Sequence, residues 1–103
     1  MKSISYKPAW ELAELIRNKA LSPVQLMKKT LERIESVNPV INAFVEIRAN
    51  QAMAEAGRIE MQIVNGMAPG PLAGIPVGVK DLEDVEGMVT SFGSIPYKDN
   101  VAK

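Results

Sequence analysis

The stretch over residues 70–81 most constrains how this chain folds, because it combines glycine and proline turn residues with a short apolar run ending in Lys80. If residues 75–80 are extended, alternate side chains point to opposite faces of a strand. Three apolar side chains then form one face, which we expect to be buried: Ile75, Val77 and Val79. Lys80 shares the other face with Gly78, which has no side chain and leaves space beside the lysine.

This pattern has two interpretations. In the first, Lys80 meets a substrate or another catalytic group in the space left by Gly78. In the second, the strand ends in a solvated charge and Asp81 begins the following loop. The pattern alone favours the second interpretation, since inferring functional sites from such features is probabilistic.

The absence of cysteine and histidine limits the chemistry of the chain. Without them, residues 1–103 hold no disulfide, no cysteine-rich zinc site, no cysteine nucleophile and no histidine-based triad. Lysine plus arginine and aspartate plus glutamate number 12 each, so no strong field attracts nucleic acid or an anionic membrane. Neither a signal peptide nor an apolar run long enough to span a membrane occurs, and we therefore expect a cytoplasmic protein.

Three helices are predicted before this stretch. The first runs from about Pro8 to Lys19 with its apolar residues on one face. The second begins at a capping box formed by Ser22 and Gln25, carries an apolar stripe, and ends at Asn38 and Pro39. The stripe consists of Val24, Met27, Leu31 and Ile34. A short strand over residues 41–48 separates it from the third helix, at about residues 49–64, which Gly66 terminates.

The segment after Lys80 is acidic and then rich in hydroxyl groups. Glu83, Asp84 and Glu86 lack the spacing of a calcium-binding loop, so we interpret them as a solvated loop and expect no metal. The run Thr-Ser-Phe-Gly-Ser at 90–94 is suited to lining a pocket. A P-loop is excluded because its glycine and lysine spacing is not met and Asp81 would repel phosphate. No dinucleotide fingerprint occurs, and we expect no cofactor.

These residues resemble the amidase signature family. The run Gly-Ile-Pro-Val-Gly-Val-Lys-Asp at 74–81 is specific, and the run at 90–94 accompanies it. Upstream pieces are similar too: Leu-Ser-Pro-Val-Gln-Leu at 21–26, the helix end at Asn38 and Pro39, and Ile-Asn-Ala-Phe at 41–44. The resemblance covers nearly the whole chain from about Leu12.

The resemblance implies hydrolysis of carboxamides by a Ser–cis-Ser–Lys triad, with Lys80 as the catalytic lysine. A lysine acts as a base only when neutral, which burial or a nearby positive charge favours. The end of a strand in an apolar sheet would supply that burial. Gly78, Asp81 and Ser94 would line the site. The two triad serines of the family lie in a Gly/Ser-rich segment well downstream, and residues 1–103 contain no such segment, so neither Ser91 nor Ser94 is assigned as nucleophile.

Three functions stay open at this point. The first is an amidase acting on a small amide substrate, of which residues 1–103 supply only the lysine and are inactive alone. The second is the A subunit of a tRNA-dependent amidotransferase, which shares the signature and needs partner subunits. The run at 90–94 is more similar to the stand-alone amidases. The third is an interaction module without catalysis.

The expected fold is α/β, with N-terminal helices followed by the first strands of a mixed sheet. Residues 1–103 would form the N-terminal segment of an amidase-signature domain. Three helices around so few strands do not close a core. We therefore expect an incomplete domain that either self-associates as a homo-oligomer or forms part of a longer protein, because an exposed sheet edge promotes aggregation.

Overall fold

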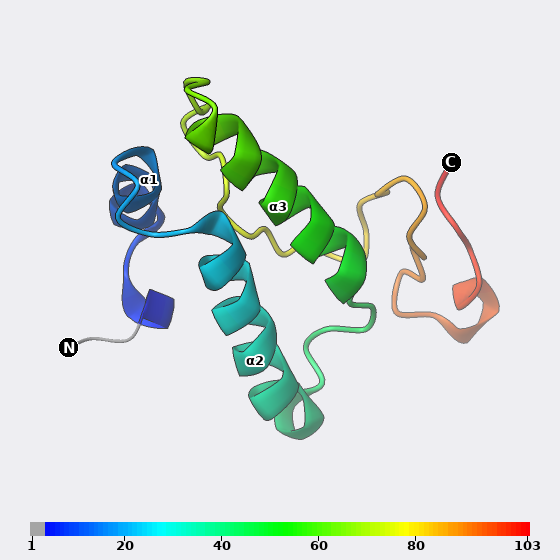
Figure 1. The fold of residues 1–103 in the computed structure, drawn as a ribbon. Helices are drawn as coiled ribbons and strands as arrows, with labels where there is room; N and C mark the ends of the chain where they lie inside the picture. Colours follow the sequence, from blue (N-terminus) through cyan, green and yellow to red (C-terminus); the bar gives the residue numbers. More distant parts are fainter. Residues whose placement is uncertain (1–3) are drawn as a thin grey trace. The chain divides into compact units, whose positions relative to one another are not determined.

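The computed structural model describes residues 4–103 and divides the chain into two units. The first unit comprises Met1–Ile41 and Arg48–Pro76, and the second comprises Asn42–Ile47 and Val77–Lys103. The first unit is helical, with the 3₁₀ turn η1 (Ile4–Tyr6) and the helices α1 (Ala9–Arg17), α2 (Pro23–Ile41) and α3 (Ala49–Val64) (Figure 1). The second unit consists of loops and the 3₁₀ turn η2 (Ile95–Tyr97).

Helix α1 begins one residue later than predicted. Pro8 has an extended backbone and stands before the first helical residue, where its missing N–H is not needed. An ion pair of 3.1 Å between Lys7 Nζ and Glu11 Oε1 spans this start. The chain turns away after the helix at Lys19, which adopts a φ of +61°, and the N–H of Ala20 donates to the carbonyl of Leu15 at 2.8 Å. This is the bond that closes a left-handed helix terminus.

The capping box predicted at the start of α2 is confirmed. Ser22 Oγ accepts hydrogen bonds from the N–H groups of Val24 at 3.1 Å and Gln25 at 3.3 Å. In return, the side-chain oxygen of Gln25 accepts a bond from the N–H of Ser22 at 3.4 Å. Pro23 at the first helical position needs no acceptor. The N-terminal donors are thus satisfied by side chains three residues apart.

The predicted end of this helix is wrong, because α2 continues through Pro39 to Ile41. Pro39 lies in the last turn, so its missing N–H removes a single hydrogen bond and leaves the preceding turns intact. The chain leaves the helix at Asn42, which has a φ of +52°. Asparagine adopts this left-handed conformation more readily than other residues with a side chain.

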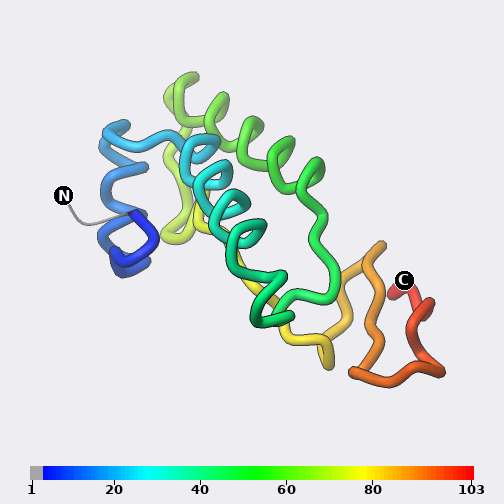
Figure 2. Tube along the Cα trace, turned by 90° about the horizontal axis from the view of Figure 1, so that it is seen from below, coloured from blue at the N-terminus to red at the C-terminus, as the bar shows by residue number. Residues whose placement is uncertain are grey.

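Helix α3 has the predicted bounds and the predicted glycine terminus. Gly66 has a φ of +85°, its N–H donates to the carbonyl of Ile63, and the N–H of Met67 donates to the carbonyl of Gln62. These two bonds form the motif that glycine favours after a helix. Helices α2 and α3 pack against each other and run in opposite directions, as both views show (Figures 1 and 2).

The core of the first unit is a small apolar cluster contributed by all three helices and by the connection between α1 and α2. Its buried members are Leu12, Ile16, Leu21, Leu26 and Ile63. Ile16 is the most enclosed of them, at 1% exposure. In α2, Leu26 is buried although it lies outside the predicted stripe, whose members are only partly buried. Which residues of α2 are buried depends on where α1 and α3 contact it, and the periodicity of a single helix does not reveal those contacts.

Ile75 packs against this cluster, and the turn before it brings the backbone close to two helices. Gly74 has a φ of +85°, and a Cβ at this position would lie 3.1 Å from Ile16 Cδ1 and 3.2 Å from the Pro23 ring. Glycine is therefore required at position 74 for two reasons, its left-handed backbone and its close approach to α1 and α2.

Both predicted strands are wrong in the part of the chain that the structure describes. Residues 42–47 form a loop, and residues 75–80 have no ladder partner. A strand needs a neighbour for its N–H and C=O groups, and alternation of side chains does not supply one. Consequently Val77 and Val79, predicted to be buried, are 76% and 53% exposed. The expected α/β fold is thus seen only as helices and loops within residues 4–103.

The second unit is held by backbone and side-chain hydrogen bonds. Val89 and Val101, near the C-terminus, form an isolated antiparallel bridge. The N–H of Ala102 donates to the carbonyl of Met88, and the N–H of Gly87 donates to the carbonyl of Ala102, both at 2.9 Å. Across residues 4–103, no helix combines the length and the apolar character that crossing a bilayer requires.

Replacing Ser22 with alanine is expected to lower the free energy of unfolding by about 1 kcal/mol, since two N-terminal N–H groups lose their acceptor. Urea denaturation followed by circular dichroism measures the change. Ser36→Ala is the matched control, because Ser36 is exposed within the same helix. Equal effects of the two substitutions would contradict the capping role.

Replacing Gly74 with alanine is expected to destabilise the first unit by at least about 1 kcal/mol, because alanine disfavours a positive φ and its Cβ would crowd Ile16 and Pro23. Gly70→Ala is the control, since a Cβ there meets nothing within 4 Å. We expect it to be neutral or slightly stabilising. Thermal denaturation of both variants gives the comparison, and a Gly74→Ala variant as stable as Gly70→Ala would refute the assignment.

Candidate functional site

Lys80 lies in an exposed loop of the second unit. The burial expected for it at the end of a sheet strand is not provided by residues 4–103. Its carbonyl accepts a hydrogen bond of 3.0 Å from the N–H of Glu83, which starts a turn. The predicted open space at Gly78 is bounded by the ring of Phe44, whose Cε1 would lie 3.6 Å from a Cβ at position 78.

Asp81, next to Lys80, is the most highly connected side chain of this unit. Its carboxylate accepts hydrogen bonds from the Ser91 N–H at 2.8 Å, from the Ser91 hydroxyl, and from the Gly93 N–H at 3.3 Å. Its own carbonyl accepts a fourth bond, from the N–H of Phe92 at 3.1 Å. We call this set of bonds between Asp81 and residues 91–93 the Asp81 clasp. It fastens the chain directly after Lys80 to a turn ten residues further on.

The clasp also perturbs the ionisation of Asp81. The Ser91 hydroxyl, followed by the Ser91 N–H, lowers the pKa of the carboxyl below its usual range, and the weaker bonds to Gly93 and Phe92 act in the same direction. Partial desolvation opposes them. Donors that point at a carboxylate favour its charged form, so the clasp is made by an ionised aspartate at neutral pH.

A second group of hydrogen bonds anchors the hydroxyl-rich run beside the clasp. Thr90, only 1% exposed, donates through Oγ1 to Asp84 Oδ1 at 2.8 Å, and its N–H donates to the carbonyl of Asn100 at 2.8 Å. Glu46 Oε2 accepts a bond of 2.7 Å from the N–H of Val89. Asp84 is exposed, in agreement with its interpretation as part of a solvated loop, and it additionally accepts a hydrogen bond from the Thr90 hydroxyl. In the sequence, the only indication of these hydrogen bonds is the hydroxyl-rich run at residues 90–94.

The predicted site residues are brought together only in part. Lys80 and Asp81 are adjacent, and Asp81 reaches Ser91 and Gly93 through the clasp. Ser94 is joined to the clasp turn through its backbone, since its N–H donates to the carbonyl of Ser91 at 2.9 Å. Within the described residues, no cluster of three or more acidic side chains is arranged to hold a metal ion.

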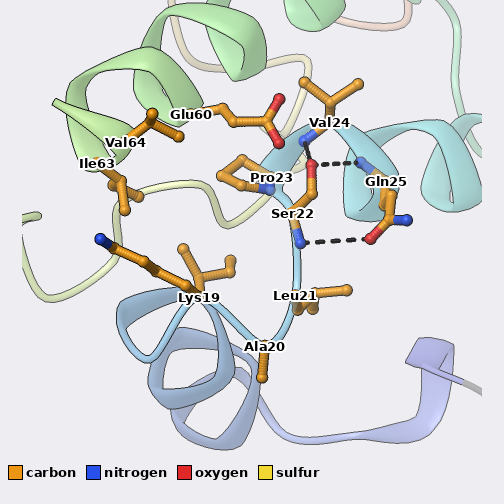
Figure 3. A pocket seen from close by; sticks show the side chains of 11 residues that line it. Lys19, Ala20, Leu21, Ser22, Pro23, Val24, Gln25, Glu60, Ile63 and Val64 are labelled. Carbon is orange, nitrogen blue, oxygen red and sulfur yellow. Dashed lines mark hydrogen bonds between the residues drawn. The ribbon is translucent and has the colours of Figure 1, made fainter.

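A separate hollow of about 470 Å³ lies on the first unit. The connection between α1 and α2, the first turn of α2 and the C-terminal part of α3 surround it (Figure 3). Glu60, Ile63 and Val64 face it from α3, and Lys19 extends along it from the end of α1 (Figure 3). None of the residues predicted from the sequence to serve catalysis lines it.

Comparison with known proteins identifies the family. The chain matches the family described as Amidase over residues 25–103, which include Lys80 and the whole Asp81 clasp. This match covers well over half of the chain, and the chain therefore belongs to the amidase signature family. The resemblance inferred from residues 74–81 and 90–94 is confirmed.

Individual relatives agree with this assignment. An acylamidase of Rhodococcus erythropolis is 35% identical over 98% of this chain and 21% of its own length. The A subunit of the glutamyl-tRNA(Gln) amidotransferase of Carboxydothermus hydrogenoformans is 38% identical over 86% of this chain and 18% of its own length. The chain thus spans about a fifth of the length of the relatives it matches.

Solved structures show the same backbone arrangement. A bacterial aryl acylamidase of the amidase signature family aligns with a TM-score of 0.88 at 32% identity, over 94% of this chain and 20% of the other. A structure described as a vestigial protein complex that reveals the evolutionary origins of an s-triazine catabolic enzyme also aligns with a TM-score of 0.88, at 31% identity over 94% of this chain and 21% of the other.

The lowered pKa of Asp81 gives a prediction for acid titration. A depressed folded-state pKa stabilises the fold above the unfolded value of about 3.9, and this contribution is lost as the pH falls through the lower, folded value. The Asp81-dependent shift of the Ser91 and Gly93 amide resonances is therefore expected to have its midpoint at a lower pH than the titration of an unstructured aspartate. A peptide of residues 79–83 provides the reference titration. A midpoint for Asp81 at or above that of the peptide would contradict the clasp.

Proposed function

We propose that this chain supplies the lysine of an amide-hydrolysing site and that Lys80 is that lysine. Two observations support the proposal: the family match includes the run at 74–81, and the residue next to Lys80 is fastened to the run at 90–94 by four hydrogen bonds. A firmly held backbone directs the side chain of its neighbour, which a catalytic base requires.

In the proposed reaction, neutral Lys80 accepts a proton through a bridging serine hydroxyl from a nucleophilic serine, which attacks the carbonyl carbon of the amide. The proton returns to the leaving ammonia or amine as the C–N bond breaks, and water, deprotonated by the same route, then attacks the acyl-serine to release the carboxylic acid and regenerate the serine hydroxyl. This route needs no histidine, in agreement with the composition. Both serines would come from sequence outside residues 1–103, so the isolated segment is expected to be inactive.

Three further residues of the segment would surround Lys80 in this reaction. Gly78 and Ser94 would border the space around Lys80, with the ring of Phe44 closing one side of it at Gly78. The proposed substrate is a carboxamide of small molecular size, as the names of the acylamidase relatives suggest.

A second candidate is the A subunit of a tRNA-dependent amidotransferase, since such A subunits from several bacteria are 33–41% identical to this chain. The two functions differ in what the protein needs. A stand-alone amidase hydrolyses simple amides by itself, whereas the amidotransferase polypeptide would release ammonia from glutamine only together with partner subunits. Assaying both reactions with the full-length protein alone separates them.

Replacing Lys80 with alanine in the full-length protein is expected to reduce kcat/KM for amide hydrolysis at least about a thousandfold, because the triad acts as a unit. Lys80→Arg should be equally inactive, since arginine stays charged and cannot serve as the base. Release of ammonia or amine from a panel of primary and aryl amides provides the measurement.

The control is Lys98→Ala, which removes another exposed lysine of the second unit and should leave the rate unchanged. Circular dichroism establishes that all three variants are folded. An active Lys80→Ala variant would eliminate Lys80 as the base, and an active Lys80→Arg variant would show that the role of the side chain is its charge.

A further inference from the structure

We propose that Asp81 is a positioning residue that sets the direction of Lys80 through the Asp81 clasp. The inference rests on the proposed function of Lys80 and extends it to the residue that follows. It starts from the geometry of the second unit, where the segment that carries Lys80 lacks the strand ladder that would normally hold it.

The clasp acts on the backbone at the point where control of Lys80 is greatest. Both the carboxylate and the carbonyl of Asp81 accept hydrogen bonds from residues 91–93, so the side chain and the main chain of the same residue are held. Restraining the carbonyl of residue 81 limits rotation of the backbone one residue away from the Cα of Lys80. The Cα–Cβ bond of Lys80 then leaves a defined point in a defined direction.

The other half of the clasp is itself immobilised. Ser91 is 7% exposed, and Thr90 before it is 1% exposed and bonded to both Asp84 and Asn100. Asp81 is therefore attached to a turn that begins at two buried residues of the same unit, Thr90 and Ser91. The fixed position of residues 90 and 91 therefore fixes the position of Asp81.

Ser91 contacts Asp81 through two different donors. Its N–H and its hydroxyl donate to the two different carboxylate oxygens of Asp81, a bidentate arrangement that fixes the plane of the carboxylate. Ser91 is thereby occupied as a donor. This occupation gives Ser91 a role in the site that differs from that of a nucleophile.

The test compares Asp81→Asn with Asp99→Asn in the full-length protein. Asparagine at 81 replaces one of the two acceptor oxygens with an NH2 group, which can donate to the Ser91 hydroxyl but leaves the N–H of Ser91 or of Gly93 without its acceptor, so the clasp is weakened. We expect kcat to fall about a hundredfold with KM changed by less than about twofold, as for a displaced catalytic group. Asp99→Asn removes the same charge from an exposed aspartate of the same unit that belongs neither to the clasp nor to its anchor, and it is expected to change kcat by about twofold or less.

Two further variants separate position from charge and from folding. Asp81→Glu keeps the charge but moves the carboxylate by one methylene, so it should not restore kcat. Ser91→Ala deletes the hydroxyl and leaves the N–H, and in the double variant with Asp81→Asn the two losses should not add, because both remove the same contact. Ser91→Ala is the milder change, and by itself it keeps the test valid if Asp81→Asn fails to fold.

A readout independent of activity accompanies the kinetics. Amide hydrogen exchange of Ser91 and Gly93, measured by NMR or mass spectrometry, should accelerate in Asp81→Asn and stay unchanged in Asp99→Asn. Wild-type kcat in Asp81→Asn, full activity in Asp81→Glu, or additive losses in the double variant would each overturn the positioning role.

The failure of this inference differs from the failure of the proposed function. If Lys80→Ala is active, Lys80 is not the base, and the positioning role fails with it even if the exchange data reveal an intact clasp. If Lys80→Ala is inactive while Asp81→Asn turns over normally, Lys80 keeps its role and only the positioning by Asp81 is refuted.

Discussion

The second unit depends on one constraint, the need of backbone N–H groups for acceptors in a segment without a strand ladder. Buried donors without partners are costly, so folded chains pair nearly all of them. Here carboxylates replace the missing ladder acceptors, since Asp81 accepts from residues 91 and 93 and Glu46 accepts from Val89. Asp81 and Glu46 are therefore structural acceptors of this unit. Their function is to hold loops in place.

The first unit rests on apolar burial and backbone conformation. Three helices enclose a small cluster around Ile16, and side chains or left-handed residues terminate each helix where it must turn. Gly74 lets the following chain approach this cluster closely enough for Ile75 to join it. The turn at residues 70–75 is thus part of the packing of the helical core, and its glycine is set by that packing.

Membership of the amidase signature family places these details in context. The relatives are about five times longer than this chain, and several side chains with large apolar surface, such as Val77 and Val79, are exposed in residues 4–103. What the segment contributes by itself is an ordered loop that presents Lys80 next to an aspartate held by four donors. The Asp81 clasp makes the order of that loop a local property of residues 81–93.

Local chemistry explains what the sequence by itself determined. The capping box at Ser22 and Gln25, the bounds of α3 and its terminus at Gly66 follow from interactions within a few residues, and each was predicted correctly. The family was also recognisable, because the run at 74–81 is specific and contiguous.

Only the tertiary structure decided the features that depend on distant partners. Residues 41–48 and 75–80 alternate like strands but find no neighbour within residues 4–103, and α2 keeps its last turn despite Pro39. The burial of Leu26 in the core depends on the packing of α1 and α3 against α2. Asp84 and Asp81 read as loop acids, and their roles became visible only when the turn at 90–93 was placed against them. A side chain ten residues away carries no signal in local periodicity, since only the folded chain brings its donors to the carboxylate.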